Sequence, residues 1–114
     1  MKFWCFYFEG YFSDDSPEYA NQGVFSDCLV KADNKTDADF AFLEALTEQK
    51  INLIEVEEDF PIDNSREEMD PKNPDNLFWI EWCEEVEMTG KPSFQTFNVY
   101  PADEVEKTKK PISN

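Results

Sequence analysis

The chain has 114 residues, which is enough for one domain with its own core and too few for two. Apolar residues make up 40% of the chain and aromatic residues 16%, so it can bury enough surface to fold although 32% of it is charged. The net charge of -16 repels nucleic acids and anionic membranes, attracts basic proteins, and excludes direct nucleic-acid or membrane binding from the expected functions.

The N-terminal third of the chain predicts two paired strands. Aromatic residues crowd residues 2–12, which is typical of a central strand with both faces covered. Residues 13–23 have the polar, Pro- and Gly-containing composition of a loop. Residues 24–32 alternate imperfectly between apolar and polar and predict a second strand, which is expected to pair antiparallel with the first.

A helix is predicted over residues 36–50. Thr36 and Asp39 have the spacing of a capping box at its start. Phe42, Ala45 and Leu46 then follow one another at three- and four-residue spacing and form one apolar stripe. We expect this stripe to pack on one face of the sheet.

The middle of the chain predicts a third strand and a long loop. Residues 51–60 alternate as a strand that begins apolar and ends acidic. Residues 61–74 are rich in Pro, Asp and Asn and exceed the usual length of a connection, which indicates a functional or mobile segment. Residues 93–100 alternate as a last strand, which Pro101 ends.

Residues 77–88 fit two structures. As a helix they follow Asn73 and Pro74, a typical N-cap and first helical residue, and they stop at Gly90. As a strand they place their aromatic residues on one face, whereas the acids near their end would oppose a helix dipole. The prediction favours the strand and keeps a second helix at 75–88 as the alternative.

Together these elements predict a single α+β domain over residues 1–101, with a mainly antiparallel β-sheet of about four or five strands and the helix on one face. Residues 102–114 are polar and are expected to form a frayed C-terminal tail. No signal peptide and no membrane span is apparent, which predicts a cytoplasmic protein. The three widely spaced cysteines, Cys5, Cys28 and Cys83, predict buried thiols and no disulfide framework.

Several classes of chemistry are excluded by what the chain lacks. It has no histidine, which removes Ser-His and Cys-His nucleophile pairs and histidine-ligated metals. Arg66 is its single arginine, and its three glycines stand apart, so neither a phosphate clamp nor a glycine-rich phosphate loop is available. The acidic segments 33–39 and 59–70 lack the Gly and the terminal Glu of an EF-hand. We therefore expect no catalytic residue, no cofactor and no metal site.

Acidic residues concentrate between Glu55 and Glu87, among several aromatic ones. If residues 55–58 and 81–87 are neighbouring strands, their outward carboxylates form one acidic sheet face. Like charges across strands cost stability, and a basic partner with aromatic anchors nearby would offset that cost. The predicted partner-binding residues are Glu55, Glu57, Glu58, Asp59, Glu81, Glu84, Glu85, Glu87 and Trp79.

The leading hypothesis is a non-enzymatic acidic protein-binding module that neutralises or inhibits a basic protein, such as a toxin or nuclease, as an immunity or inhibitor protein or a nucleic-acid charge mimic does. A second hypothesis is a small-molecule-binding domain or carboxylate-dependent enzyme with a pocket under the loops 13–23 and 61–76. A third is an acidic soluble domain with no special partner face. The sequence leaves the oligomeric state open.

Overall fold

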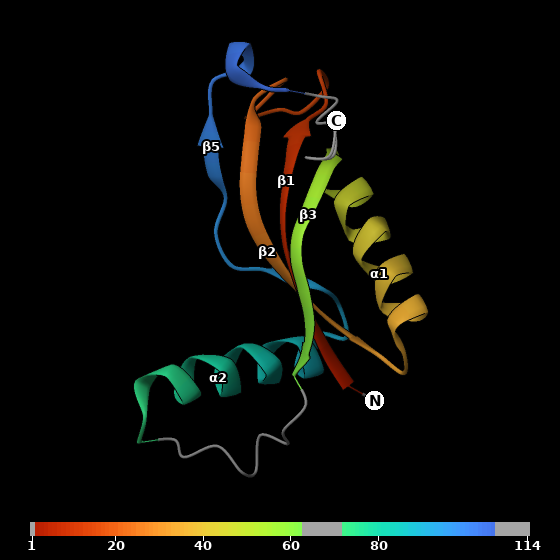
Figure 1. Cartoon of the computed structure of the whole chain (residues 1–114), viewed down its shortest axis with the longest axis vertical. Coiled ribbons are helices and arrows are strands. Elements are labelled where there is room, and N and C mark those ends of the chain that lie inside the picture. The colour runs from red at the N-terminus through yellow and green to blue at the C-terminus, as the bar shows by residue number, and fades with distance from the viewer. Residues whose placement is uncertain (1, 63–71, 107–114) are drawn as a thin grey trace, which may run out of the picture.

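Five antiparallel strands and two helices form the fold in the computed structural model, which describes residues 2–62 and 72–106 (Figure 1). The predicted α+β class with an antiparallel sheet is confirmed. In chain order the elements are β1 (Lys2–Phe12), β2 (Gly23–Ala32), α1 (Lys35–Glu48), β3 (Ile51–Ile62), α2 (Pro74–Thr89), β4 (Ser93–Phe94), β5 (Asn98–Tyr100) and the 3-10 turn η2 (Ala102–Glu104).

The sheet is organised around β1. Its strand order is β3-β1-β2-β4, with β5 also paired to β2, so β1 lies between the two longest partners. Successive side chains of a strand point to opposite faces. Phe6 and Phe8 therefore face one side and Phe3 and Cys5 the other, and all four are buried. The aromatic density of residues 2–12 predicted this central, doubly covered position.

The helix α1 covers the Phe6 side of the sheet (Figure 1). Phe42 stacks on Phe6 with ring centroids 4.3 Å apart and meets Phe8 edge-on at 5.2 Å. The predicted helix is confirmed, but its cap is not Thr36. The side chain of Asn34 accepts a 2.9 Å hydrogen bond from the backbone N–H of Asp37, so the cap lies two residues before Thr36 and the helix begins at Lys35.

Residues 77–88 belong to the helix α2, so the strand favoured by the sequence is wrong. The cap signals were correct: Asn73 accepts a 3.0 Å hydrogen bond from the N–H of Asp75, and Gly90 ends the helix with φ 69°. The acids near its C-terminus do oppose the dipole, at a cost of about 0.3–1 kcal/mol for each of them. Burial of Trp82 and Val86 outweighs that cost, since each contributes about 1.5–3 kcal/mol.

The helix α2 packs on the face opposite α1. Its buried side chains, Trp82, Cys83 and Val86, form a second core cluster with Phe3, Cys5 and Leu29. In Figure 1 this helix crosses one end of the sheet and leaves the other end of the same face open. The sheet is therefore covered along one face by α1 and only partly along the other by α2.

Two of the predicted strands differ from the structure in their extent. The expected last strand is broken into β4 and β5, and residues 95–97 between them bond to the edge of β2, where the Ser26 hydroxyl donates to the Thr96 carbonyl at 2.5 Å. β3 continues through Pro61 to Ile62, which an edge strand tolerates. The remaining residues of the predicted loop at 63–71, and residues 107–114 of the predicted tail, lie outside the described residues.

Candidate functional site

The open half of the α2-side face is the candidate site. Cys5 and Leu29 lie opposite each other beneath α2. Further along the same two strands, Tyr7 lies opposite Asp27 and Glu9 opposite Phe25. Because residues two apart in a strand share a face, these four side chains lie on the same face as Cys5 and Leu29, further along the strands.

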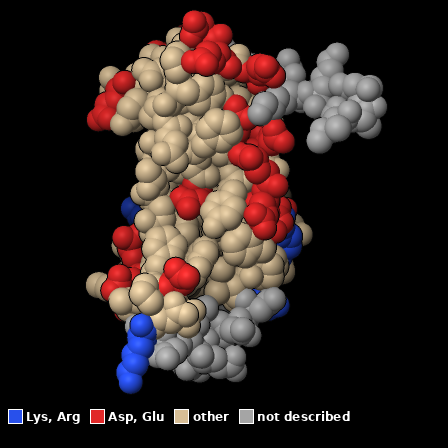
Figure 2. Space-filling view, turned by 60° about the vertical axis from the view of Figure 1, so that its left-hand side comes forward, with Lys and Arg blue, Asp and Glu red and all other residues tan. Residues whose placement is uncertain are grey.

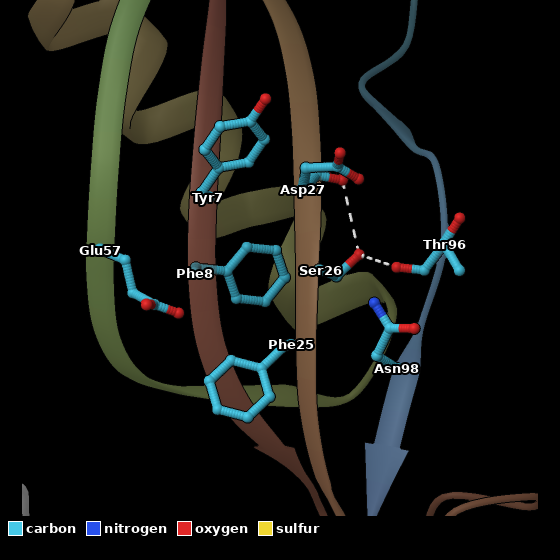
Figure 3. A pocket seen from close by; sticks show the side chains of 8 residues that line it. All are labelled: Tyr7, Phe8, Phe25, Ser26, Asp27, Glu57, Thr96 and Asn98. Carbon is cyan, nitrogen blue, oxygen red and sulfur yellow. Dashed lines mark hydrogen bonds between the residues drawn. The ribbon is translucent and has the colours of Figure 1, made fainter.

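A cavity of 470 Å³ lies on this open half (Figure 3). Figure 3 shows Tyr7, Phe25 and Glu57 around one opening, with Asp27 and Asn98 on the side of β2 and β5. A second cavity, of 460 Å³, shares Phe25 and Asn98 with the first, so the two adjoin. We call the surface made by Tyr7, Phe25, Asp27, Glu57 and Glu58 the acidic-aromatic face.

An irregularity in β3 brings two neighbouring carboxylates to this face. Glu58 pairs with Tyr7, but Val56 pairs with Phe8, so Glu57 is an extra residue in the ladder. Such a bulge interrupts the alternation of side chains. Val56 packs into the core on the α1 side, whereas Glu57 lines the cavity and Glu58 lies opposite Tyr7. In an unbroken strand the two glutamates would point to opposite faces.

Burial and the charges of Asp27 and Glu58 shift the pKa values of groups on this face. Burial raises the pKa of the Asp27 carboxyl, although hydrogen bonds with the backbone of Gln95 and Thr96 act in the opposite direction. The pKa of Tyr7 is raised first by burial and then by Cys5, Asp27 and Glu58. Burial, followed by the charges of Asp27 and Glu58, raises the pKa of Cys5 to about 12. The face thus disfavours additional negative charge and favours a cation.

A buried carboxylate marks the end of the face remote from α2. Glu9 is only 3% exposed, and the Tyr100 hydroxyl donates a hydrogen bond to its Oε2. The Tyr100 ring lies directly over Gly23, where a Cβ would come within 2.0 Å of the ring. Phe25 packs beside Tyr100 with ring centroids 5.4 Å apart. Glycine at residue 23 therefore allows Tyr100 to reach across β2 to Glu9.

The predicted residues of β3 separate between two faces. Glu57 and Glu58 belong to the acidic-aromatic face, and Glu55 lies opposite Glu9 in the register of the same face. Asp59 points to the α1 side, where Lys35 forms an ion pair with it at 3.3 Å. Asp59 therefore does not join the other carboxylates.

The predicted residues of α2 form a separate group. Glu85 accepts a hydrogen bond from the Ser93 hydroxyl, and Glu87 lies 3.9 Å from the Nζ of Lys31. Glu81 and Glu84 are exposed on the helix. Trp79 packs edge-on against Phe60, with ring centroids 6.1 Å apart, and helps to attach α2 to β3. The single acidic sheet face expected from two neighbouring strands does not form, because α2 is not a strand beside β3.

Sequence reasoning missed the contributions of β1 and β2. Tyr7, Phe25 and Asp27 were assigned to strands but not to a site. A signal was present in residues 2–12, where the even positions Phe6 and Phe8 are purely apolar while the odd positions change from apolar to Tyr7 and then Glu9. That change predicts a face that is covered at one end and polar at the other.

The expected thiols are confirmed: Cys5, Cys28 and Cys83 are free and buried. Among residues 2–62 and 72–106, no cluster of His, Cys, Asp or Glu is arranged to hold a metal ion. Within that part of the chain, no helix is long and apolar enough to cross a membrane.

A cavity of 330 Å³ lies beside the loop that joins β1 to β2, where the small-molecule hypothesis placed part of its pocket. The carboxylates lining it, Glu18 and Glu48, are exposed, so no buried convergent pair is found there. The other part of that expected pocket, around 63–71, lies outside the described residues.

Comparison of the chain with models of known protein families, with curated proteins and with solved structures gave no match. The function is therefore argued from the charge and geometry of the acidic-aromatic face.

Proposed function

We propose that this protein is a non-enzymatic binding module that docks a basic protein through the acidic-aromatic face and neutralises or inhibits it. The observation that carries the proposal is the bulge in β3, which places Glu57 and Glu58 together beside Tyr7 and Phe25, on the half of the sheet that neither of the two described helices covers. Carboxylates beside exposed rings suit a partner that brings positive charge and apolar surface together.

The electrostatic cost of the face supports a basic partner. Glu57 and Glu58 are neighbours on one face of the sheet, and like charges held close together repel each other. Within the described residues, no lysine or arginine forms an ion pair with Glu57 or Glu58, and the ion pairs of Lys31, Lys35 and Lys50 involve other acids. A partner's cations would replace this repulsion with attraction.

The charge of the whole chain supports fast association with such a partner. Acidic side chains form a column beside a broad uncharged surface in Figure 2, and basic side chains lie near the margins of that view. With a net charge of -16, the protein attracts a basic protein over a distance and is repelled by nucleic acid. Blocking the basic groove of a nuclease or toxin is the form of inhibition that suits these properties.

The test is capture of the partner at low salt from lysate of the source cells. The bait is the wild-type chain, the Glu57→Lys/Glu58→Lys variant, or a control, Glu44→Lys/Glu48→Lys, which makes the same charge change on the exposed side of α1. The wild type and the control are expected to retain a basic protein and inhibit its activity, and the β3 variant to lose both. Binding should weaken steeply with added salt. Capture of no basic protein, or equal losses in both variants, would overturn the proposal.

A further inference from the structure

We infer that the 470 Å³ cavity of the acidic-aromatic face receives an arginine side chain of the basic partner, with its guanidinium against the rings of Tyr7 and Phe25 and its N–H groups toward the carboxylates of Asp27 and Glu57. This inference rests on the proposed function and adds the chemistry by which the partner is recognised.

The lining of the cavity combines the two kinds of group that bind a guanidinium. Tyr7 and Phe25 come from adjacent strands and present rings to the opening, and Phe25 is 39% exposed. A cation over an aromatic face is attracted by the ring, and arginine also stacks its plane on it. Glu57 lies on the β3 side of these rings with its carboxylate directed toward them, and it supplies acceptors for the paired donors of arginine. Asp27 lies on the β2 side and adds negative charge to the site.

Arginine suits the cavity better than lysine because the site is partly removed from water. Asp27 is half-buried in β2, so water solvates its charge incompletely. A guanidinium loses its hydration more readily than an ammonium and keeps five donors in a fixed plane. A lysine would bring the same charge, but it would lose more hydration and could not stack its charged group as a plane on Tyr7 and Phe25.

The groups in the cavity favour an organic cation over a metal ion. In the described part of the chain, no cluster of carboxylates meets the geometry of a metal site. Hard metal ions bind oxygen ligands and gain little from rings, whereas the rings of Tyr7 and Phe25 line this cavity beside its two carboxylates. Its 470 Å³ falls within the range of about 300–1,000 Å³ typical of ligand pockets, which admits a side chain and part of its flanking backbone.

Docking on the face is also favoured over addition of a partner strand to the sheet edge. β3 is the terminal strand of the sheet, and such an edge can pair with another chain. Its ladder, however, has two irregularities, and Pro61 lacks an N–H to donate. Bulges, a proline and charges are the features by which edge strands avoid pairing. The partner is therefore held through side chains on the face.

Two short blocked peptides test the inference. Both present two basic residues separated by serine, and they differ only in carrying arginine or lysine. Calorimetric titration of the full chain at low salt is expected to show the arginine peptide binding about tenfold tighter, which corresponds to one additional charge-assisted hydrogen bond. NMR spectra of the wild type should show the largest shifts in the ring protons of Tyr7 and Phe25, a readout that needs no variant.

Matched variants test whether the preference for arginine depends on the acidic-aromatic face. Phe25→Leu and Asp27→Asn are expected to remove the preference for arginine. Phe40→Leu and Glu44→Gln make the same kinds of change on α1 and should leave it intact, since Phe40 is 68% exposed and Glu44 lies on the outer side of the helix.

The outcomes separate the inference from the proposed function. Equal affinity for both peptides, or an arginine preference that survives Phe25→Leu and Asp27→Asn, overturns the arginine site while the salt-sensitive capture of a basic protein still stands. If neither peptide binds but a basic protein is captured, the inference again fails alone. If no basic protein is captured, both fail. An arginine preference lost in the two face variants and kept in the α1 controls supports the inference.

Discussion

Removing the hydroxyl of Tyr100 tests what holds the end of the open face remote from α2. In Tyr100→Phe, the Glu9 carboxylate, which is 3% exposed in the wild type, loses a hydrogen bond. Hydrogen bonds to charged groups contribute about 1.5–3 kcal/mol to the free energy of unfolding. A chain of 114 residues has an unfolding entropy of about 0.24 kcal/mol/K, so the melting temperature should fall by about 6–12 °C.

The assay is thermal unfolding followed by circular dichroism, with urea unfolding as an independent measure of the free energy. Tyr19→Phe is the matched control, because its ring packs against Phe12 at 4.9 Å and its hydroxyl has no hydrogen-bond partner among the described residues. The control should change the free energy of unfolding by less than about 0.5 kcal/mol. If Tyr100→Phe melts within about 2 °C of the wild type, or if Tyr19→Phe loses as much, the hydroxyl does not stabilise Glu9 as argued.

Two further predictions concern the core and the face. Phe42→Ala should lower the free energy of unfolding, measured in urea, by about 3–5 kcal/mol because the ring is buried against β1. The control Phe40→Ala on the same helix should lower it by less than about 0.5 kcal/mol. Similar losses in the two variants would contradict the packing of Phe42. As pH falls through the raised pKa of Asp27, the native state takes up a proton before the unfolded state, so the wild type should gain stability relative to Asp27→Asn down to about pH 3.8. A difference in urea midpoint between the two that does not change with pH would refute this.

The helix α1 shows what the sequence pattern predicts well. Phe42, Ala45 and Leu46 repeat at helical spacing, and all three are buried. The cap was misplaced by two residues because Thr36 and Asp39 have capping-box spacing, yet Asn34 has the better position for its side chain to reach a free backbone N–H. The periodic spacing of apolar residues involves the whole face of the helix, whereas a cap depends on one hydrogen bond. The sequence therefore predicts the helix more reliably than the residue that caps it.

Residues 77–88 were wrongly predicted as a strand because local preferences were considered without the tertiary contacts of α2. Its aromatic residues have strand propensity, and its last acids oppose the dipole, so both local preferences disfavour a helix. The stripe formed by Trp82, Cys83 and Val86 buries against β1 and β2, residues distant in the sequence, and this burial stabilises the helix by more than the two local preferences oppose it. Asn73 and Gly90 correctly predicted the two ends of the helix, because capping does not depend on the surface against which the helix packs.

The candidate site was predicted only in part, because it depends on register. Acids in β3 were expected to bind a partner, but Glu57 and Glu58 share one face of the sheet because of a bulge. This bulge contains no glycine from which the sequence could have predicted it. The partners from β2, Phe25 and Asp27, reach the site through pairing with β1. Such pairing is fixed by the whole sheet, so a linear pattern could place these residues in a strand but not beside Glu57.

The open face lies between two covered regions of the sheet, one beneath the helix α2 and the other beneath the side chain of Tyr100. At one end α2 buries Cys5, and at the other Tyr100 covers Glu9, so Tyr7 lies between them on the same face of β1. Side chains two residues apart in a strand are separated by about 6–7 Å, so the interval between Cys5 and Glu9 is about 13 Å. A helix about 10–12 Å across would fill nearly all of that interval, whereas a single side chain fits between the two covered ends with room to spare. The fold therefore favours a partner that inserts individual side chains, which is what an arginine in the 470 Å³ cavity would do.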